Sequence, residues 1–483
     1  MDRGRPARLA ALLALALSLP LWGQAAEPSS ASLRRRLQSL IDHPGWRRAQ
    51  VGAQVQSLAS GEVLYSVRAD VPLMAASLTK LGTALAALKR WGPAHTFRTE
   101  IYGRPPDANG TVSGDLVIKA YGDPSMVQER LWTIARELRQ RGVERIAGDL
   151  VFDGSYLEPA PFPSGWRNVP STKSYYAPLS PFALNFNLVA VKVAPGPAPG
   201  APAAVASEPE SSYIQIRNSA RTSSRAGRAS IAALSQSIDG HTQLTVRGII
   251  PSAIPQPEVR YFAVVDPLRN YQAALLRLLQ EQGIEMQGQL REGPAPPGAP
   301  LCSFEGRSLA WILRLMNKFS NNFIADQLLR LLSAETAGPP GTTEKGAAFV
   351  RQTLIEAGLD PNAFQVLDGS GLTYENRYSA AAMVRLLQAA YSDFRLRTEF
   401  IGSLGINGYD GSIDDRMLAE HVVGLVRAKT GHLNSVTNIA GYVASRDGEV
   451  FAFAILANNY SAGTGTIHRL QDQMVSALAE FSR

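Results

Sequence analysis

Apolar residues recur at helical intervals in a segment near the start of the chain. Leu78, Leu81, Leu85 and Leu88 lie three or four positions apart among alanines. This spacing predicts an amphipathic helix with a buried apolar stripe, which ends near 91–93 where Trp-Gly-Pro stops it. A short helix is predicted over 33–41. Two strands, over 50–58 and 62–67, are predicted between it and the helix that carries the leucines.

The region from about 98 to 262 has a different pattern. Short apolar or alternating stretches predict strands over 97–102, 114–120, 148–153, 187–194, 212–217 and 242–250, with one helix over 126–142. A Pro/Ala/Gly-rich stretch over 195–204 predicts a loop. We therefore expect an inserted, β-rich region of one or two subdomains, in which no residue pattern by itself indicates catalysis.

Helical periodicity returns after residue 265. Asp266 followed by Pro267 predicts a helix N-cap with proline at the first helical position. Further helices are predicted over 308–317 and 323–332, with the polar residues 320–322 in the loop between them. A strand over 422–426 that leads into the segment 428–432, a hairpin of 439–445 and 449–456, and a last amphipathic helix over 467–481 complete the prediction.

The N-terminus has the pattern of a secretory signal peptide. Arginines at 3, 5 and 8 precede an apolar run over 9–22, and small residues follow at 23–26. The apolar run is shorter than the ~20 residues that a membrane-spanning helix needs. We expect residues 1–26 to be removed, the mature protein to be periplasmic, and no later segment to cross a membrane.

These patterns divide the 483 residues into four parts. They are a signal peptide (1–26), the first part of a main domain (27–97), the inserted region (98–262) and the second part of the main domain (263–483). A chain of this length is too long to fold around one hydrophobic core.

The net charge of +7 comes mostly from arginines spread along the chain without a basic block. This favours an anionic envelope polymer over nucleic acid as a partner. Cys302 is the only cysteine, which excludes an intrachain disulfide.

Candidate chemistry begins at the head of the first long helix. Ser77 and Lys80 lie three residues apart, on one helix face. A serine is a weak nucleophile unless a base takes its proton, and a lysine is such a base only when burial or another cation disfavours its ammonium. Free amides at the helix N-terminus could also bind an oxyanion. The alternative, a capping serine and a solvated lysine, is the better interpretation of an isolated Ser-x-x-Lys.

Two later motifs change that balance. Ser320 and Asn322 form Ser-x-Asn, and Lys429, Thr430 and Gly431 form Lys-Thr-Gly. The three motifs in this order are typical of serine penicillin-recognising enzymes. Five other segments have sequences typical of one family within this group: 114–119, 122–124, 148–153, 368–372 and 410–413. With these segments and the three motifs, the chain resembles the low-molecular-mass class C penicillin-binding proteins of the penicillin-binding protein 4 type. These are periplasmic D-alanyl-D-alanine carboxypeptidases and endopeptidases.

The resemblance implies an α/β (α+β) fold, in which a transpeptidase-like domain with an antiparallel sheet flanked by helices carries a large β-rich insertion. It implies Ser77 as the acylated nucleophile and Lys80 as its base. Ser320 would relay a proton to the leaving group, and Asn322 would bond the substrate's peptide. Penicillins would inhibit the enzyme by acylating Ser77.

The third motif is implied to bind substrate. Lys429 and Thr430 would bind the terminal carboxylate of a peptidoglycan peptide, and the backbone amides of Ser77 and His432, beside Gly431, would form the oxyanion hole. A fixed lysine and hydroxyl suit a carboxylate on physical grounds as well. Repulsion from Lys429 is also expected to lower the pKa of Lys80.

Two positions concern the rest of the substrate. Asp153 matches a family acidic residue thought to meet the amino group of the stem peptide's diamino acid. Tyr374 stands where many relatives have an arginine, and Arg377 lies one helical turn on.

Other chemistries fit less well. Six histidines occur and none pair at i and i+4, which argues against a zinc peptidase. The segment 369–371 lacks the Gly-x-Ser-x-Gly pattern of a nucleophile elbow. No metal or cofactor is expected. A slowly acylating penicillin or muropeptide sensor remains an alternative, and a β-lactamase ranks below it because no glutamate motif marks a deacylating base.

Overall fold

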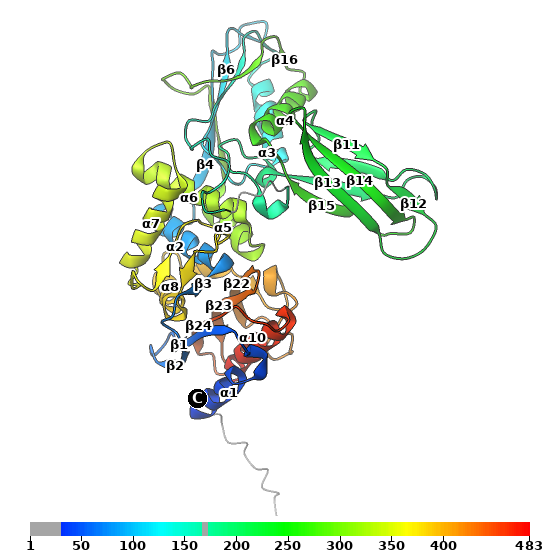
Figure 1. Cartoon of the computed structure of the whole chain (residues 1–483). Helices are drawn as coiled ribbons and strands as arrows, with labels where there is room; N and C mark the ends of the chain where they lie inside the picture. The colour runs from blue at the N-terminus through cyan, green and yellow to red at the C-terminus, as the bar shows by residue number, and fades with distance from the viewer. Residues whose placement is uncertain (1–29, 167–171) are drawn as a thin grey trace, which may run out of the picture.

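The two ends of the chain meet in one six-stranded antiparallel sheet (Figure 1). The computed structural model describes residues 30–166 and 172–483, so the expected signal peptide lies outside the described residues. The sheet order is β2-β1-β24-β23-β22-β21. Its strands are β2 (Val63–Val67), β1 (Gln50–Ser57), β24 (Val450–Asn458), β23 (Val436–Ala444), β22 (Val426–Leu433) and β21 (Gly405–Ile406). The N-terminal hairpin is thereby fixed to the C-terminal strands along the whole of β1.

Both faces of this sheet are buried. In β24, Phe451, Phe453 and Ile455 face one core, whereas Ala452 and Ala454 face the other. A strand covered on both sides has no polar face, which explains its continuous apolar run. The first core is covered by α1 (Ser30–Ile41) and α10 (Thr464–Ala479), and the second by α2 (Thr79–Trp91), α5 (Leu309–Lys318), α6 (Asn322–Ala337), α7 (Thr343–Glu356) and α8 (Ala380–Ser392). The second set includes α2, which carries Lys80, and α6, which begins at Asn322.

The insertion is built on a second, five-stranded sheet with the order β17-β8-β6-β4-β18. Its elements are β4 (Thr96–Tyr102), β6 (Leu116–Ala120), β8 (Leu150–Asp153), β17 (Leu290–Glu292) and β18 (Cys302–Ser308), with α3 (Gln128–Gln140) and α4 (Pro267–Glu281) packed against it. Because α4, β17 and β18 belong to this unit, the boundary predicted at 262/263 is wrong. The chain returns to the main domain only at α5.

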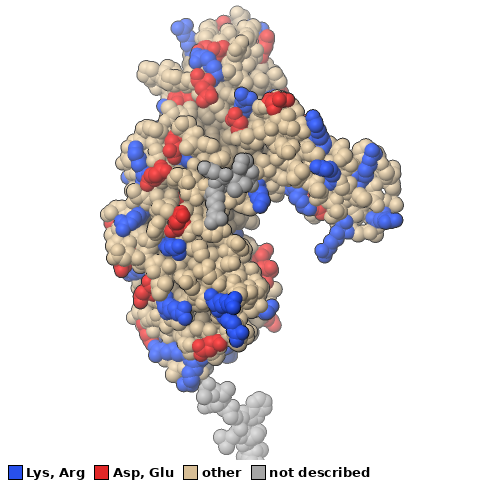
Figure 2. All heavy atoms as spheres, in the orientation of Figure 1, with Lys and Arg blue, Asp and Glu red and all other residues tan. Residues whose placement is uncertain are grey.

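A β-sandwich projects from the insertion as an arm (Figure 1). One sheet has the order β10-β9-β15 and the other β11-β14-β12, with β13 also paired to β14. The strands are β9 (Leu188–Ala194), β10 (Ala204–Glu208), β11 (Ile214–Asn218), β12 (Arg221–Ser223), β13 (Ser230–Ile238), β14 (His241–Pro251) and β15 (Glu258–Ala263). Figure 2 shows a hollow between the arm and the main domain, and Lys and Arg side chains spread over the visible face without one block.

The remaining short elements complete the two domains. They are β5 (Thr111–Val112), β7 (Arg145–Ile146) and β16 (Glu285–Met286) in one small sheet, β3 (Leu73–Met74), β19 (Phe364–Gln365) and β20 (Arg377–Tyr378) in another, and α9 (Arg397–Gly402). Within the described ranges, none of the helices combines the length and the apolar character that crossing a membrane requires.

Most long elements agree with the sequence-based prediction, including α1, the β1–β2 hairpin, α3 and the β23–β24 hairpin. Asp266 caps α4 by accepting a hydrogen bond from the Arg269 N–H, and Pro267 follows at the first position, as predicted. The strand predicted over 422–426 is wrong, because residues 420–424 form turns and β22 starts at Val426. Val422 is apolar because it packs in the core of the α1 and α10 face.

Candidate active site

Ser77 lies in a 3₁₀ turn, Ala76–Leu78, that runs directly into α2. Lys80 follows on the same face, and its Nζ donates to Ser77 Oγ at 3.0 Å. Ala76 has a φ of +49°, a conformation that is costly for a residue with a Cβ. No side chain caps the turn or the start of α2, and the amides of Leu78 and Thr79 donate to carbonyls of the turn itself. The predicted pairing of Ser77 with Lys80 is present.

Lys80 is completely buried and surrounded by acceptors. Besides Ser77 Oγ, its Nζ donates to Asn322 Oδ1 at 2.7 Å and to the Ser370 carbonyl at 2.6 Å. A neutral amine has two N–H bonds, and these two fixed acceptors use both of them. The lone pair then points at the Ser77 hydroxyl, which is the arrangement that a general base needs.

Burial lowers the pKa of Lys80 to about 8, while the charges of Asp326 and Asp368 oppose that shift. The desolvation of the ammonium is therefore what frees the amine. The sequence predicted burial or a second cation as the cause of a lowered Lys80 pKa, and burial is the main one. The repulsion between the two lysines lowers the pKa of Lys429.

The loop between α5 and α6 brings the second motif to the same place. Ser320 has a φ of +56°, and Asn321 caps α6 by accepting from the Ile324 N–H at 3.0 Å. Asn322, the first residue of α6, accepts from Lys80 and donates from Nδ2 to the Tyr175 carbonyl at 3.0 Å. The insertion therefore contributes Tyr175 to the wall of the site, which the sequence did not indicate.

Lys429 lies on β22, the strand next to the edge strand β21 of the main sheet, and is completely buried. Its Nζ donates to Ser320 Oγ at 3.0 Å and to the Thr430 carbonyl at 2.7 Å. Burial holds the pKa of Lys429 well below its usual value, and the nearby charge of Lys80 lowers it further. All five residues predicted to be catalytic thus lie in one connected cluster: Ser77, Lys80, Ser320, Asn322 and Lys429.

Strand β22 runs directly along the backbone of the Ser77 turn. A Cβ added to Gly431 would lie 2.8 Å from the Ala75 carbonyl oxygen and 3.2 Å from the Ser77 nitrogen. Only glycine permits this approach, which brings the backbone before His432 beside the Ser77 amide. The His432 ring faces away toward Thr437, with Nδ1 3.3 Å from Thr437 Oγ1, so the ring itself has a structural contact.

Thr430 contacts Ser412, which the sequence analysis named only as part of the segment 410–413. Its Oγ1 lies 2.7 Å from Ser412 Oγ. Ser412 is held in place by a turn in which both carboxylate oxygens of Asp410 accept from Lys318 Nζ at 2.6 Å. Two hydroxyls therefore lie side by side next to Lys429, a set of donors suited to a carboxylate.

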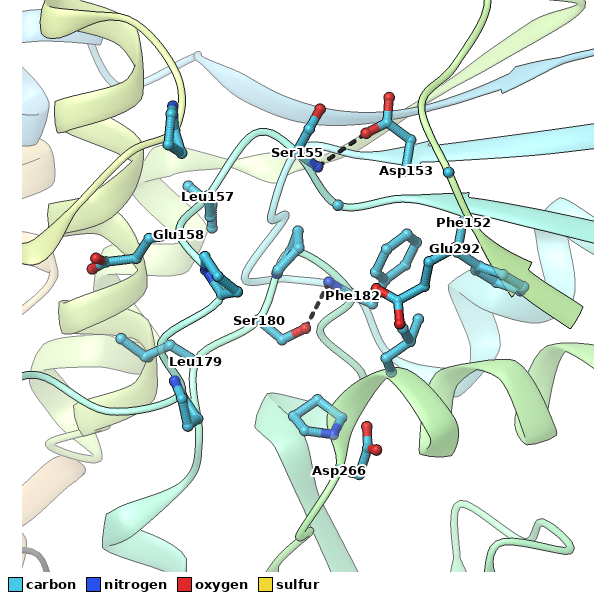
Figure 3. Close-up of a pocket in the computed structure, with 18 of the residues that line it drawn as sticks. Phe152, Asp153, Ser155, Leu157, Glu158, Leu179, Ser180, Phe182, Asp266 and Glu292 are labelled. Carbon is cyan, nitrogen blue, oxygen red and sulfur yellow. Dashed lines mark hydrogen bonds between the residues drawn. The ribbon is translucent and has the colours of Figure 1, made fainter. Parts of the chain in front are cut away.

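The structure places Asp153 away from this cluster, in the insertion. It lies at the edge of a pocket of about 810 Å³ between β8, β17 and the start of α4 (Figure 3). The side chain is 3% exposed, and its oxygens accept from the Ser155 N–H at 2.9 Å and the Ala295 N–H at 2.8 Å. Lys119 Nζ is 3.5 Å away. Burial opposes ionisation, but these hydrogen bonds and Lys119 lower the pKa of Asp153. The described contacts of Asp153 are all structural.

The whole described chain fits one known family. Residues 33–481 match the D-Ala-D-Ala carboxypeptidase 3 (S13) family. The D-alanyl-D-alanine carboxypeptidase of Actinomadura sp. (strain R39) is 30% identical, over 99% of this chain and 92% of that protein.

Solved structures share the fold. The crystal structure of penicillin binding protein 4 from Haemophilus influenzae superimposes with a TM-score of 0.77 at 24% identity, covering 92% of this chain and 99% of that one. The same protein complexed with a novel β-lactam gives a TM-score of 0.72 at 23% identity, covering 92% of this chain and 100% of that one. These findings agree with the resemblance carried by the three motifs. The chain belongs to the D-Ala-D-Ala carboxypeptidase 3 (S13) family.

Proposed function

We propose that this protein is a D-Ala-D-Ala carboxypeptidase that acts on the stem peptides of peptidoglycan through an acyl-Ser77 intermediate. The observation that carries the proposal is the environment of Lys80. Its Nζ reaches Ser77 Oγ at 3.0 Å while Asn322 and Ser370 occupy its two other hydrogen-bonding directions. A solvated or purely structural lysine would not need this arrangement.

Acylation begins with a proton transfer. As Ser77 Oγ attacks the carbonyl of the D-Ala-D-Ala bond, its proton moves to Lys80 Nζ, which becomes an ammonium. The oxyanion that forms is placed against the backbone amides of Ser77 and His432. The tetrahedral intermediate collapses when the C–N bond breaks, and the departing amine of D-Ala needs one proton.

Ser320 is positioned to deliver that proton. Its Oγ accepts from Lys429 Nζ, so the hydroxyl hydrogen is free to point toward the leaving amine while the lysine replaces it. The Lys80 ammonium then loses its proton to solvent, and Lys429 regains one from solvent. Water attacks the acyl-enzyme while the neutral Lys80 takes one proton from it, and this proton returns to Ser77 Oγ as the ester bond breaks and the shortened peptide leaves. Every proton taken from Ser77 or water is returned to a product or to the next cycle.

The terminal carboxylate gives the carboxypeptidase its specificity. Lys429, Thr430 and Ser412 form a group of donors on and beside β22, and a carboxylate bound there orients the terminal D-Ala as leaving group. The same acyl transfer would open the D-amino-acid cross-links of peptidoglycan. Asn322 and the Tyr175 backbone lie where the peptide of the substrate would pass.

Three further parts of the proposal rest on the sequence. The N-terminal pattern supports export to the periplasm, and the family's relation to β-lactams supports acylation of Ser77 by penicillin. Asp153 stays proposed as a contact of the diamino acid. Because Tyr374 stands in the place of the family arginine, recognition of a free side-chain carboxylate at this position is not part of the proposal.

Intact mass measurement after brief incubation with benzylpenicillin tests the proposal, with wild type beside Ser77→Ala. A penicilloyl adduct is expected on wild type only, together with release of D-Ala from a D-Ala-D-Ala peptide. Adduct formation without D-Ala release would favour the slow sensor instead, and decay of the adduct within seconds would favour a β-lactamase. The absence of an adduct on folded wild type would refute the acyl-Ser77 chemistry.

A further inference from the structure

A buried carboxylate lies behind Lys80 and has no part in the mechanism described so far. Asp326 is on α6, one helical turn after Asn322, and its side chain is completely buried. Its Oδ1 accepts from the Gly369 N–H at 2.7 Å. Buried carboxylates are rare unless a specific interaction requires them. Asp326 bonds to the turn at 368–371, and this turn also contacts Lys80.

That turn, residues 368–371, is held from both sides. The Gly369 carbonyl accepts from Thr83 Oγ1 on α2 at 2.9 Å, and the Gly369 N–H is bonded to Asp326 on α6. A Cβ on Gly369 would lie 2.4 Å from the Ala325 carbonyl oxygen, so the turn packs against the α6 backbone. The next carbonyl, that of Ser370, is the one that accepts from Lys80 at 2.6 Å.

Three charged groups face Asp326. They are Lys80 on α2, Asp368 in the turn and Arg330 on α6 itself. Burial raises the pKa of Asp326 to about 7, the charge of Asp368 adds to this, and Lys80 opposes it. Conversely, the charge of Asp326 opposes the lowering of the Lys80 pKa by burial. The carboxyl and the amine therefore titrate close together and influence each other directly.

We propose that Asp326 is a positioning residue for Lys80. It fixes the turn whose carbonyl accepts from Lys80, and its buried negative charge stabilises the ammonium that forms when Ser77 gives up its proton. In this step the Ser77 O–H bond breaks and a Lys80 N–H bond forms, while Asp326 neither gains nor loses a proton. The proposal rests on the acyl-serine function proposed above and adds a determinant of its pH range.

The test is the pH profile of acylation by benzylpenicillin, measured from pH 5 to 10 on Asp326→Asn and wild type. The asparagine keeps an oxygen for the Gly369 N–H but removes the charge. Without that charge Lys80 loses its proton more readily, so the midpoint of the acid limb is expected to fall by about one pH unit. The plateau rate is expected to fall about tenfold, because Lys80 becomes a weaker base.

Two controls separate charge from structure. Thr83→Val removes the hydroxyl that donates to the Gly369 carbonyl without changing any charge. This variant should acylate more slowly, while the midpoint of its pH profile stays at the wild-type value. Asp123→Asn removes a buried carboxylate of the insertion and should change neither. An Asp326→Asn profile with the wild-type midpoint would overturn the proposal. If wild type itself forms no adduct, it is the proposed function that fails.

A second measurement applies even where Asp326→Asn does not fold. Infrared difference spectra record the protonation of carboxyl groups in wild type and in Lys80→Met, which keeps the side-chain volume. A carboxyl that titrates near pH 7 in wild type is expected to titrate at higher pH in Lys80→Met, because its neighbouring cation is gone. If no carboxyl responds to Lys80→Met, the pairing is refuted.

Discussion

Lys429 Nζ lies 3.0 Å from Ser320 Oγ, so a single hydrogen bond joins strand β22 of the main sheet to the loop between α5 and α6. The donor is completely buried, and burial together with Lys80 keeps the pKa of Lys429 well below its usual value. The same nitrogen is thus placed both to renew the proton of Ser320 and to attract the substrate's carboxylate.

Lys429→Ala should therefore affect substrates with a free C-terminus most. Loss of a charge-assisted hydrogen bond corresponds to about 1.5–3 kcal/mol, or roughly 10- to 150-fold in kcat/KM. We expect this loss for a peptide ending in a D-Ala carboxylate and a smaller loss for the same peptide with a C-terminal amide. Equal losses for both peptides would mean that Lys429 acts only through Ser320. Hydrolysis rates of the two peptides provide the measurement.

Acylation should depend on pH through Lys80. The pKa of Lys80 is lowered to about 8, and only the neutral amine can accept the Ser77 proton. The rate is expected to rise from acid pH, reach half its maximum near pH 8, and at pH 6 be about a hundredth of the plateau. Lys80→Arg, whose side chain stays protonated, should show no such rise. A wild-type rate that is constant between pH 6 and 9 contradicts this assignment.

Gly371→Ala should disrupt the nucleophile turn. Gly371 has a φ of +81°, and a Cβ there would lie 1.8 Å from the Ala76 carbonyl oxygen, next to Ser77. Gly61 has a similar φ of +77° with nothing within 4 Å, so Gly61→Ala is the matched control. The control should lose about 1 kcal/mol of unfolding free energy and keep its acylation rate. Gly371→Ala should lose more stability and most of its acylation; similar behaviour of the two variants would argue against the contact.

Asp153→Asn distinguishes a structural role from a role in substrate binding. The pKa of Asp153 is lowered in the folded protein. Its carboxylate therefore stabilises the fold above about pH 4, and this contribution disappears as the pH falls through the lowered pKa. We expect Asp153→Asn to be about 1–3 kcal/mol less stable at pH 7, with a difference that shrinks at pH 3. Denaturant unfolding at both pH values measures it.

The role of Asp153 in binding has its own readout. If the carboxylate meets the amino group of the diamino acid, Asp153→Asn should raise KM for peptides with a free side-chain amine and not for their acetylated forms. An unchanged KM ratio between the two forms, together with the loss of stability, would leave Asp153 with its hydrogen bonds to Ser155 and Ala295 alone.

Several parts of this protein could be predicted from the sequence because local rules determine them. Ser77 and Lys80 share a face since a helical turn brings positions three apart together, and Asp266 caps α4 through an interaction within four residues. The five positions predicted to be catalytic were identified from motif spacing. Their convergence in one cluster agrees with that identification.

Contacts between distant segments were decided by the tertiary structure. Strand β17 pairs with β8, so that Leu290 lies beside Leu150, and short strands of this kind carry no signal for their partner. The predicted domain boundary at 262/263 failed for this reason. In the site, Lys80 is held by a backbone carbonyl, that of Ser370, and faces Asp326. Every residue has a carbonyl, and a lone aspartate in an apolar helix resembles any other. Only the packing of α2 and α6 against the turn at 368–371 shows which carbonyl and which carboxylate govern the base.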